Sequence, residues 1–480
     1  MQSRKAGVAR GMSVAMAAVL ITAALIVAGC TAANNFVSNV STVGTNTTSV
    51  PVSITDAPGD QVVAASLTLN SVVLTDQKNQ TSSILSAPLT FEAAHLDAVQ
   101  EPLFTPAIPQ DTYTSVTLTY SNAQVAYIDP TTKQLAVAAA TLANTSQVFT
   151  FPTPLVVNNT TTSLIIDFLV ANSVSVSGTT VTVTPQFHIA PAPIAATPTN
   201  GANGLMTGIK GKVSALGTNQ FTLTNPEGLS LVVAVNSSTQ YQGLSGFSAL
   251  AVGALVEVDV QIEANATLLA LRVEEQVPPN ATAELLIGPV TAVTGSPVTS
   301  FTQVVRQQVG PPPTATPVQK DTITVNSQTQ WVMPGLWQNL LAAGLPFKPT
   351  FNASTLFAGQ VVAVQTGGVS NNTATAQTVF LAPQTVSGTI TSGGGALPTC
   401  VPCWESLTLT LPADSWLAMV TGQTTVTVMV NSGIQALPGA PISNNSVARF
   451  NGFLFMNNGA LTLVAVVEGP PPGTPIGPTI

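Results

Sequence analysis

The segment Val235-Asn-Ser-Ser-Thr-Gln-Tyr241 recurs as Val325-Asn-Ser-Gln-Thr-Gln-Trp331, with a weaker third copy at Val430-Asn-Ser-Gly-Ile-Gln435. Each copy follows a short apolar pattern that begins with a glycine, namely Gly211, Gly288 and Gly388. Recurrence of one module in series is the signature of a repeat architecture, and alternation of apolar and polar residues indicates strands. We therefore predict three small five-stranded β-barrel-like repeats in the second half of the chain.

The repeats are assigned to residues 204–276, 283–383 and 384–468. Gly253 in the first copy and Gly359 in the second align with Asn444 in the third. Asparagine fits there because it tolerates left-handed backbone better than other residues with a side chain. The Pro-rich tail, residues 469–480, is predicted to be disordered.

Residues 51–190 have the pattern of a separate β domain. Val116, Leu118 and Tyr120 alternate with threonines, and a hairpin is indicated around Ser177–Thr180. Period-two alternation with frequent turns predicts an antiparallel β-sandwich, which puts the whole chain in the all-β class. Residues 191–203, rich in Pro and Ala, are expected to form a linker to the repeats.

Both halves resemble known families. The first half contains, in order, Thr55-Asp-Ala-Pro58, Gln110-Asp-Thr-Tyr-Thr114, Ile165-Ile-Asp-Phe168 and Val183-Thr-Pro185. This series is similar to the bacterial lipoprotein family catalogued as domain of unknown function 4382. The repeats resemble domain of unknown function 5666. Neither resemblance implies an activity; both imply β-rich modules outside the cytoplasm.

The N-terminus has the features of a lipoprotein precursor. Three basic residues precede an uncharged apolar stretch, Met12–Val27, which is too short for a full membrane span and suits a signal peptide. The stretch ends in Val27-Ala28-Gly29-Cys30, which resembles the bacterial lipobox. We expect residues 1–29 to be a signal peptide, Cys30 to carry lipid, and residues 30–50 to be a flexible tether.

The composition limits the choice of partner. Charged residues make up only 7% of the chain. Removing residues 1–29 leaves 12 − 3 = 9 basic and 20 acidic side chains, a net charge of −11. Nucleic-acid binding needs clustered Lys and Arg, so it is excluded as an expectation. The expected partners are the membrane, through the lipid, and a protein or a glycan; no cofactor is expected.

Three groups of residues are candidate sites. Cys400-Val-Pro-Cys403 precedes a strand pattern, which favours a disulfide, with a redox or metal site as alternatives. Asp56, Asp60 and Asp167 are metal candidates that would suit Ca²⁺, although capped or solvated carboxylates are the simpler interpretation. The four tryptophans are either aromatic platforms for a ligand or parts of the core: Trp331, Trp337, Trp404 and Trp416.

The two histidines, His95 and His188, lack a nucleophile-elbow sequence and are interpreted as structural. No catalytic residue is therefore assigned. The leading hypothesis is a lipid-anchored, non-catalytic protein of the cell envelope, at the outer membrane and facing either the periplasm or the surface. The alternatives are a carbohydrate-binding lipoprotein, with Ca²⁺ in its first domain, and an envelope hydrolase or thiol oxidoreductase.

Overall fold

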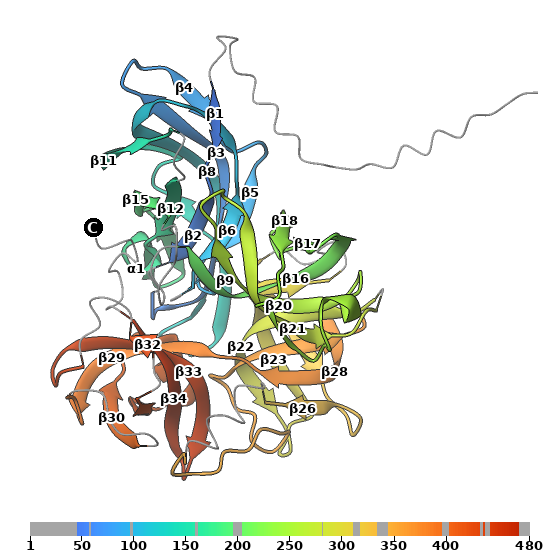
Figure 1. Ribbon diagram of the computed structural model, residues 1–480. Coiled ribbons are helices and arrows are strands. Elements are labelled where there is room, and N and C mark those ends of the chain that lie inside the picture. The colour runs from blue at the N-terminus through green and yellow to red at the C-terminus, as the bar shows by residue number, and fades with distance from the viewer. Residues whose placement is uncertain are drawn as a thin grey trace, which may run out of the picture. The chain divides into compact units, whose positions relative to one another are not determined.

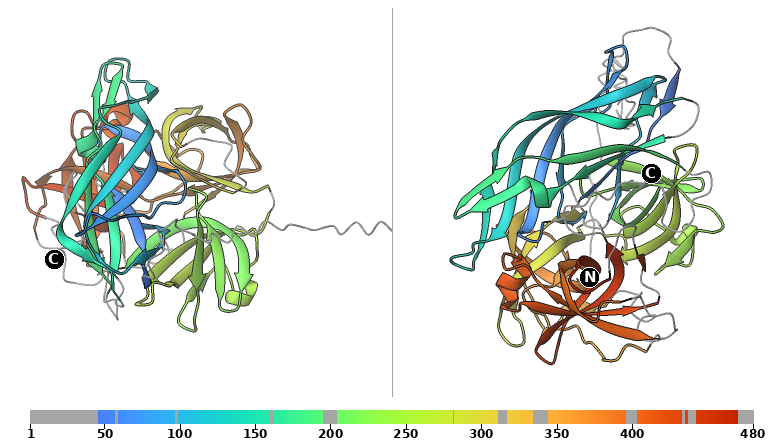
Figure 2. Two further views of the ribbon diagram at one scale, coloured as in Figure 1. Left: turned by 90° about the horizontal axis from the view of Figure 1, so that it is seen from above. Right: turned by 90° about the vertical axis from the view of Figure 1, so that its left-hand side faces the viewer.

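The computed structural model describes 46–56, 59–96, 99–158, 162–194, 204–280, 282–310, 317–333, 344–395, 403–432, 435–436 and 442–469. All of these residues belong to one compact unit, residues 38–480. Nearly every element in them is a strand, in agreement with the all-β prediction (Figures 1 and 2). None of the helices in this part of the chain combines the length and hydropathy that a bilayer crossing requires.

The first sheet of the sandwich is built on two long antiparallel strands. Along β8, Val116, Leu118 and Tyr120 are fully buried while the threonines between them are half-buried, as period-two alternation predicts. The members of this sheet are β3 (Val62–Asp76), β4 (Thr81–Ser83), β5 (Leu89–Glu92), β8 (Thr112–Ile128), β9 (Leu135–Ala139) and β11 (Ser146–Val156).

The second sheet is mixed rather than wholly antiparallel. Its order is β15 (Phe187–Pro193), β12 (Thr162–Phe168), β2 (Val52–Asp56) and β6 (Glu101–Phe104). β2 and β12 run parallel, because the long chain between them allows the crossover that parallel pairing needs. Almost all of both strands is buried, so polar Ser53, Thr55 and Asp167 lie inside with the apolar residues.

Short elements complete the sandwich, and its boundaries differ from the predicted ones. β1 (Thr47–Ser49) pairs with β7 (Ala107–Pro109), so the predicted tether over 30–50 ends too late. β15 runs to Pro193, so the predicted linker over 191–203 begins too early. The expected hairpin is confirmed, with Gly178 at φ +60° in its turn. The remaining elements are β10 (Thr141–Leu142), α1 (Val170–Ser173), β13 (Val174–Ser177) and β14 (Thr180–Val183).

The first repeat is a closed five-stranded barrel. The ring closes where β18 pairs in parallel with β21, at Val233 opposite Leu268. The elements are β16 (Leu205–Gly217), β17 (Gln220–Thr224), β18 (Ser230–Ala234), β19 (Gln240–Gln242), the 3₁₀ turn η1 (Phe247–Ala249), β20 (Leu255–Ile262) and β21 (Leu268–Val277).

The other two repeats follow the same order of pairings, and the third is likewise a closed five-stranded barrel. The second comprises β22 (Glu284–Thr294), β23 (Ser300–Val305), β24 (Gln307–Val309), β25 (Gln319–Thr324), β26 (Gln330–Val332), β27 (Val361–Thr366) and β28 (Thr373–Leu381). The third comprises β29 (Gln384–Ser392), β30 (Trp404–Thr410), α3 (Trp416–Thr421), β31 (Thr425–Asn431), β32 (Gln435–Ala436), β33 (Val447–Asn457) and β34 (Ala460–Gly469).

The glycine that leads each repeat lies where its strand changes partners. In β22, residues 284–289 pair with β27, and residues 290–294 pair with β23. A Cβ atom on Gly288 would lie 1.8 Å from the Val304 carbonyl oxygen, and one on Gly388 would lie 2.5 Å from the Thr410 carbonyl oxygen. Only glycine permits this close approach of two backbones.

Cross-strand register corrects the alignment of the third repeat by one residue. Gly211 lies opposite Val256 and Gly388 lies opposite Ala448. Ala448 is therefore the equivalent of Val256, and Asn445 rather than Asn444 is the equivalent of Gly253. Asn445 has φ +68°, so left-handed backbone recurs at this place in the third repeat.

The repeated Asn-Ser-x-Thr mark is a turn that ties one strand to another. In the first repeat the Asn236 amide donates to the Thr239 hydroxyl (3.0 Å), which donates to the Ala270 carbonyl in β21 (2.8 Å). In the second repeat Thr329 makes the same two bonds, with Asn326 and Ala376. The mark is thus a structural device of the repeat.

The modules share their hydrophobic cores. Val63 and Ile128 of the sandwich belong to the same buried cluster as Phe450 in the third repeat. Another cluster joins Phe301 of the second repeat to Phe453 of the third. Because these clusters cross the module boundaries, the described modules form one packed body.

We expect Gly288→Ala to lower the free energy of unfolding by about 3 kcal/mol or more, because a methyl group here meets backbone that cannot yield. The measurement is the urea midpoint. Gly395→Ala is the matched control, since a Cβ there meets nothing within 4 Å. Equal midpoints for the two variants would contradict the close-approach argument.

Thr239→Val should cost about 1–3 kcal/mol, because it leaves a backbone amide and a carbonyl without their hydroxyl partner. Ser237→Ala, on an exposed residue of the same turn, serves as the control. Denaturant unfolding of both variants checks this, and a loss as large in Ser237→Ala would show that the turn is merely sensitive to any change.

Candidate functional site

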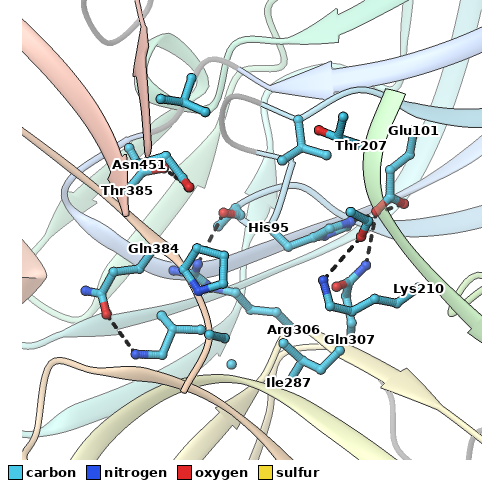
Figure 3. A pocket seen from close by; sticks show the side chains of 18 of the residues that line it. His95, Glu101, Thr207, Lys210, Ile287, Arg306, Gln307, Gln384, Thr385 and Asn451 are labelled. Carbon is cyan, nitrogen blue, oxygen red and sulfur yellow. Dashed lines mark hydrogen bonds and ion pairs between the residues drawn. The ribbon is translucent and has the colours of Figure 1, made fainter. Parts of the chain in front are cut away.

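A cavity of about 300 Å³ lies where the sandwich meets all three repeats. Its walls combine His95 and Glu101 of the sandwich with Lys210 of the first repeat, Arg306 of the second and Gln384 of the third. Figure 3 shows these side chains converging from different strands and from the turns beside them. Charged groups are scarce in this chain, so their concentration here marks the region as the candidate site.

Glu92, at the end of β5, is held in place by hydrogen bonds to the backbone. Its carboxylate is 1% exposed and accepts hydrogen bonds from the backbone amides of Ala65 (2.8 Å), Ala94 (3.0 Å) and His95 (2.9 Å). Its Oε2 also lies 3.1 Å from Nδ1 of His95. The backbone turn after β5 therefore fixes both the carboxylate and the orientation of the imidazole.

The opposite edge of the imidazole faces two more carboxylates. Nε2 of His95 lies 3.5 Å from Oε2 of Glu101, at the start of β6. Glu227 comes from the turn between β17 and β18 in the first repeat. One ligand atom from each of His95, Glu101 and Glu227 lies within 4.8 Å of the others, which makes these three residues the candidate metal ligands. We call Glu92, His95, Glu101 and Glu227 the His95 cluster.

Burial and mutual interaction shift the pKa values of the ionisable groups in the cluster. Burial would lower the pKa of His95, but the charges and hydrogen bonds of Glu101 and Glu92 outweigh it and raise that pKa to about 10. Burial and then the charge of Glu101 raise the pKa of Glu227 to about 7. Burial also opposes ionisation of Glu101, yet His95 and Lys210 hold its pKa below the usual range. The cluster thus stabilises the positively charged form of His95 and disfavours ionisation of Glu227.

A second group of charges lies on the adjoining face of the first barrel. Arg272 in β21 contacts Glu257 (2.7 Å), Asp259 (2.7 Å) and Glu274, and Lys210 in β16 contacts Glu257 (3.3 Å). The register places Asp259 opposite Arg272 and Lys210 opposite Glu257, so cross-strand pairing produces the network. Lys210 therefore has a carboxylate partner of its own besides the field of Glu101.

Arg306 and Gln307 connect the second repeat to the sandwich. Arg306 donates from Nε to the Val63 carbonyl (2.7 Å) and from Nη1 to the Ala94 carbonyl (3.2 Å). Gln307 donates to Oε1 of Glu101 (3.3 Å). These bonds hold the second repeat against the turn that positions His95.

The aspartates proposed as metal candidates are not gathered into one site. Asp56 pairs with Phe168 and Asp167 pairs with Thr55, so the two carboxylates project from opposite faces of the sheet. Asp56 accepts a hydrogen bond from the Val170 amide (3.1 Å), next to α1. The carbonyl of Asp60 accepts from the Trp416 amide (2.8 Å). Asp56 and Asp60 thus receive structural contacts.

Three of the four tryptophans considered as aromatic platforms pack in or against the hydrophobic core. Trp416 is 7% exposed and belongs to a core cluster. Trp331 and Trp404 are half-buried against the core of the second and third repeats, and Trp331 meets Phe351 edge to face at 5.4 Å. Trp337 lies outside the described residues.

The lipobox residues Val27, Ala28, Gly29 and Cys30 also lie outside the described residues, as does Cys400. Cys403 is disulfide-bonded. The pairing of Cys403 with Cys400 and the lipid on Cys30 stay predictions.

Sequence reasoning missed the His95 cluster. It treated His95 as a structural residue in an irregular stretch, and Glu101 and Glu227 drew no attention. The local signal was Glu92-Ala-Ala-His95, a carboxylate and an imidazole three residues apart. The contribution of Glu227 had no signal, because it depends on how the first repeat packs against the sandwich.

Comparison with known proteins agrees with the interpretation of the chain as a series of separate domains. Residues 47–185 match the family described as Domain of unknown function (DUF4382), and residues 210–274 match Domain of unknown function (DUF5666). No curated protein matches the chain. A solved structure described as drosophila Unr CSD456 is similar at 10% identity over 54% of this chain and 95% of that chain, with a TM-score of 0.12, which is too low to support an argument. The chain therefore carries a DUF4382 domain followed by a DUF5666 domain, in the order that its motifs indicate.

Proposed function

We propose that this chain is a lipid-anchored, non-catalytic protein of the bacterial cell envelope that acts as a rigid structural or binding module. The proposal of a rigid module rests on the junction between the sandwich and the three repeats. Core residues are shared across module boundaries, and Arg306 and Gln307 bind the sandwich through directed hydrogen bonds. Such a body holds its surface loops in fixed relative positions, which suits display and scaffolding.

The anchoring part of the proposal rests on the sequence. The basic start, the apolar stretch and Val27-Ala28-Gly29-Cys30 together favour lipid attachment and an envelope location. More than one acyl chain gives firm anchoring where a single chain is marginal. A net charge of −11 after removal of residues 1–29 leaves little basic surface for anionic lipids, so the lipid would supply the membrane affinity.

The alternatives draw less support. Carbohydrate stacking needs exposed aromatic faces, whereas Trp416 is buried and Trp331 and Trp404 pack against a core. A thioredoxin-type redox site places its reactive cysteine at a helix N-terminus, whereas Cys403 precedes a strand. These placements favour a structural or protein-binding role over sugar stacking and thiol redox chemistry.

Palmitate labelling of growing cells that express the full chain tests the anchor. The chain should be labelled, and Cys30→Ala should lose the label and leave the membrane fraction. The double variant Cys400→Ser, Cys403→Ser controls for the other two thiols and should keep the label. Continued labelling of Cys30→Ala would refute lipid attachment at this residue.

Replacing Arg306 tests the rigid junction. Arg306→Met removes the donors to Val63 and Ala94, so the free energy of unfolding should fall by about 2–3 kcal/mol, and the single denaturant transition should broaden or split. Lys320→Met, at an exposed position in the same repeat, should leave the curve unchanged. Two separate transitions in the unmodified chain would contradict a single packed body.

A further inference from the structure

We propose that His95, Glu101 and Glu227 bind a divalent transition-metal ion of the zinc type, and that this ion ties the sandwich to the first repeat. The inference goes beyond the structural role proposed above, because it assigns a ligand of stated chemistry to a defined set of side chains. One imidazole and two carboxylates are a donor set that Zn²⁺ accepts, with an open position left for water or a further ligand.

The spacing of the three donors fits such an ion. In a tetrahedral site with bonds of about 2.1 Å, two ligand atoms lie about 3.4 Å apart. Nε2 of His95 and Oε2 of Glu101 are 3.5 Å apart, and the donor atoms of His95, Glu101 and Glu227 all lie within 4.8 Å of one another. A modest closing movement of Glu227 completes the coordination.

The imidazole is already oriented as a ligand. Glu92 lies beside Nδ1 of His95, and three backbone amides hold that carboxylate in place. A metal-bound histidine commonly donates its second N–H to a carboxylate, which fixes the tautomer and aims the other nitrogen at the ion. Here the same arrangement aims Nε2 at Glu101 and Glu227.

A separate observation concerns two buried polar atoms of the cluster. The side chain of His95 is only 8% exposed, and its buried Nε2 makes no hydrogen bond of ordinary geometry within the described residues; the Glu101 carboxylate lies 3.5 Å away. Oε2 of Glu227 is also a buried atom without a hydrogen bond. Buried polar atoms are nearly always satisfied, so two such atoms at one place are suited to bind a cation.

The charges around the cluster favour a cation. Glu92, Glu101 and Glu227 surround a single imidazole, so three carboxylates and one histidine meet at this place. Of the nearby cations, Lys210 forms an ion pair with Glu257, and Arg306 donates hydrogen bonds to two backbone carbonyls. A divalent ion would add positive charge next to the three carboxylates of the cluster.

The position of Glu227 gives the ion a structural consequence. The turn that carries it is tight, with the Leu229 amide donating to the Asn225 side chain (2.8 Å) and the Gly228 amide donating to the Asn225 carbonyl (3.0 Å). A second cavity of about 260 Å³ is lined by Glu92, Glu227 and Gln307, while His95 and Glu101 line the first, so members of the cluster border both cavities. Bound there, the ion crosslinks two modules.

The test uses the full mature chain, stripped with a chelator and titrated with Zn²⁺ by calorimetry, with metal content measured after gel filtration. We expect one Zn²⁺ per chain and a higher thermal midpoint in its presence. His95→Gln and Glu227→Gln should each lower the affinity at least tenfold. His188→Gln, at the chain's other histidine, should bind as the unmodified protein does.

Substitution with Co²⁺ provides a readout that stability alone does not change. The unmodified chain should give the visible absorption of a low-coordinate site, and Glu227→Gln, which keeps the size and shape of the side chain, should lose it while keeping its fold by circular dichroism. Absence of stoichiometric Zn²⁺ in the unmodified chain, binding of Ca²⁺ in its place, or equal affinity in Glu227→Gln and His188→Gln would each overturn the assignment.

Discussion

The repeats depend on one backbone constraint: a single strand must pair with different neighbours along its two halves. That exchange lets five short strands close on themselves and leaves no open edge for other chains to pair with. It also brings two backbones so close that a methyl group has no room at Gly288 or Gly388. The glycine that begins each repeat in the sequence is thus the residue on which barrel closure depends.

The junction between modules follows a different principle. A chain with 7% charged residues can build most of its body from apolar and hydroxyl-bearing side chains. It nevertheless places Arg306, Glu101 and His95 in the region where its modules meet. Directed, charge-assisted bonds specify one mutual arrangement of the modules, which a purely apolar contact would leave less well defined.

Much of the architecture could be predicted from the sequence, because it is encoded locally. Alternation along Val116, Leu118 and Tyr120, the hairpin at Gly178 and the repeated Asn-Ser-x-Thr turn each depend on neighbouring residues. The parallel pairing of β2 with β12 was missed, because pairing of distant strands leaves no periodic signal. The His95 cluster was missed for the same reason: Glu92 and His95 are close in sequence, but Glu227 reaches them only when the modules pack.

The core shared by the sandwich and the third repeat affects the order in which the molecule can mature. Synthesis and the export proposed above both deliver the chain from its N-terminus, so the residues of the sandwich are in place before those of the last repeat. Until that repeat arrives, Val63, Ala64 and Ile128 lack the cover that Phe450 and its neighbours provide. The first module to fold must therefore wait with an apolar surface unprotected, and a truncated chain would keep that surface exposed for its lifetime.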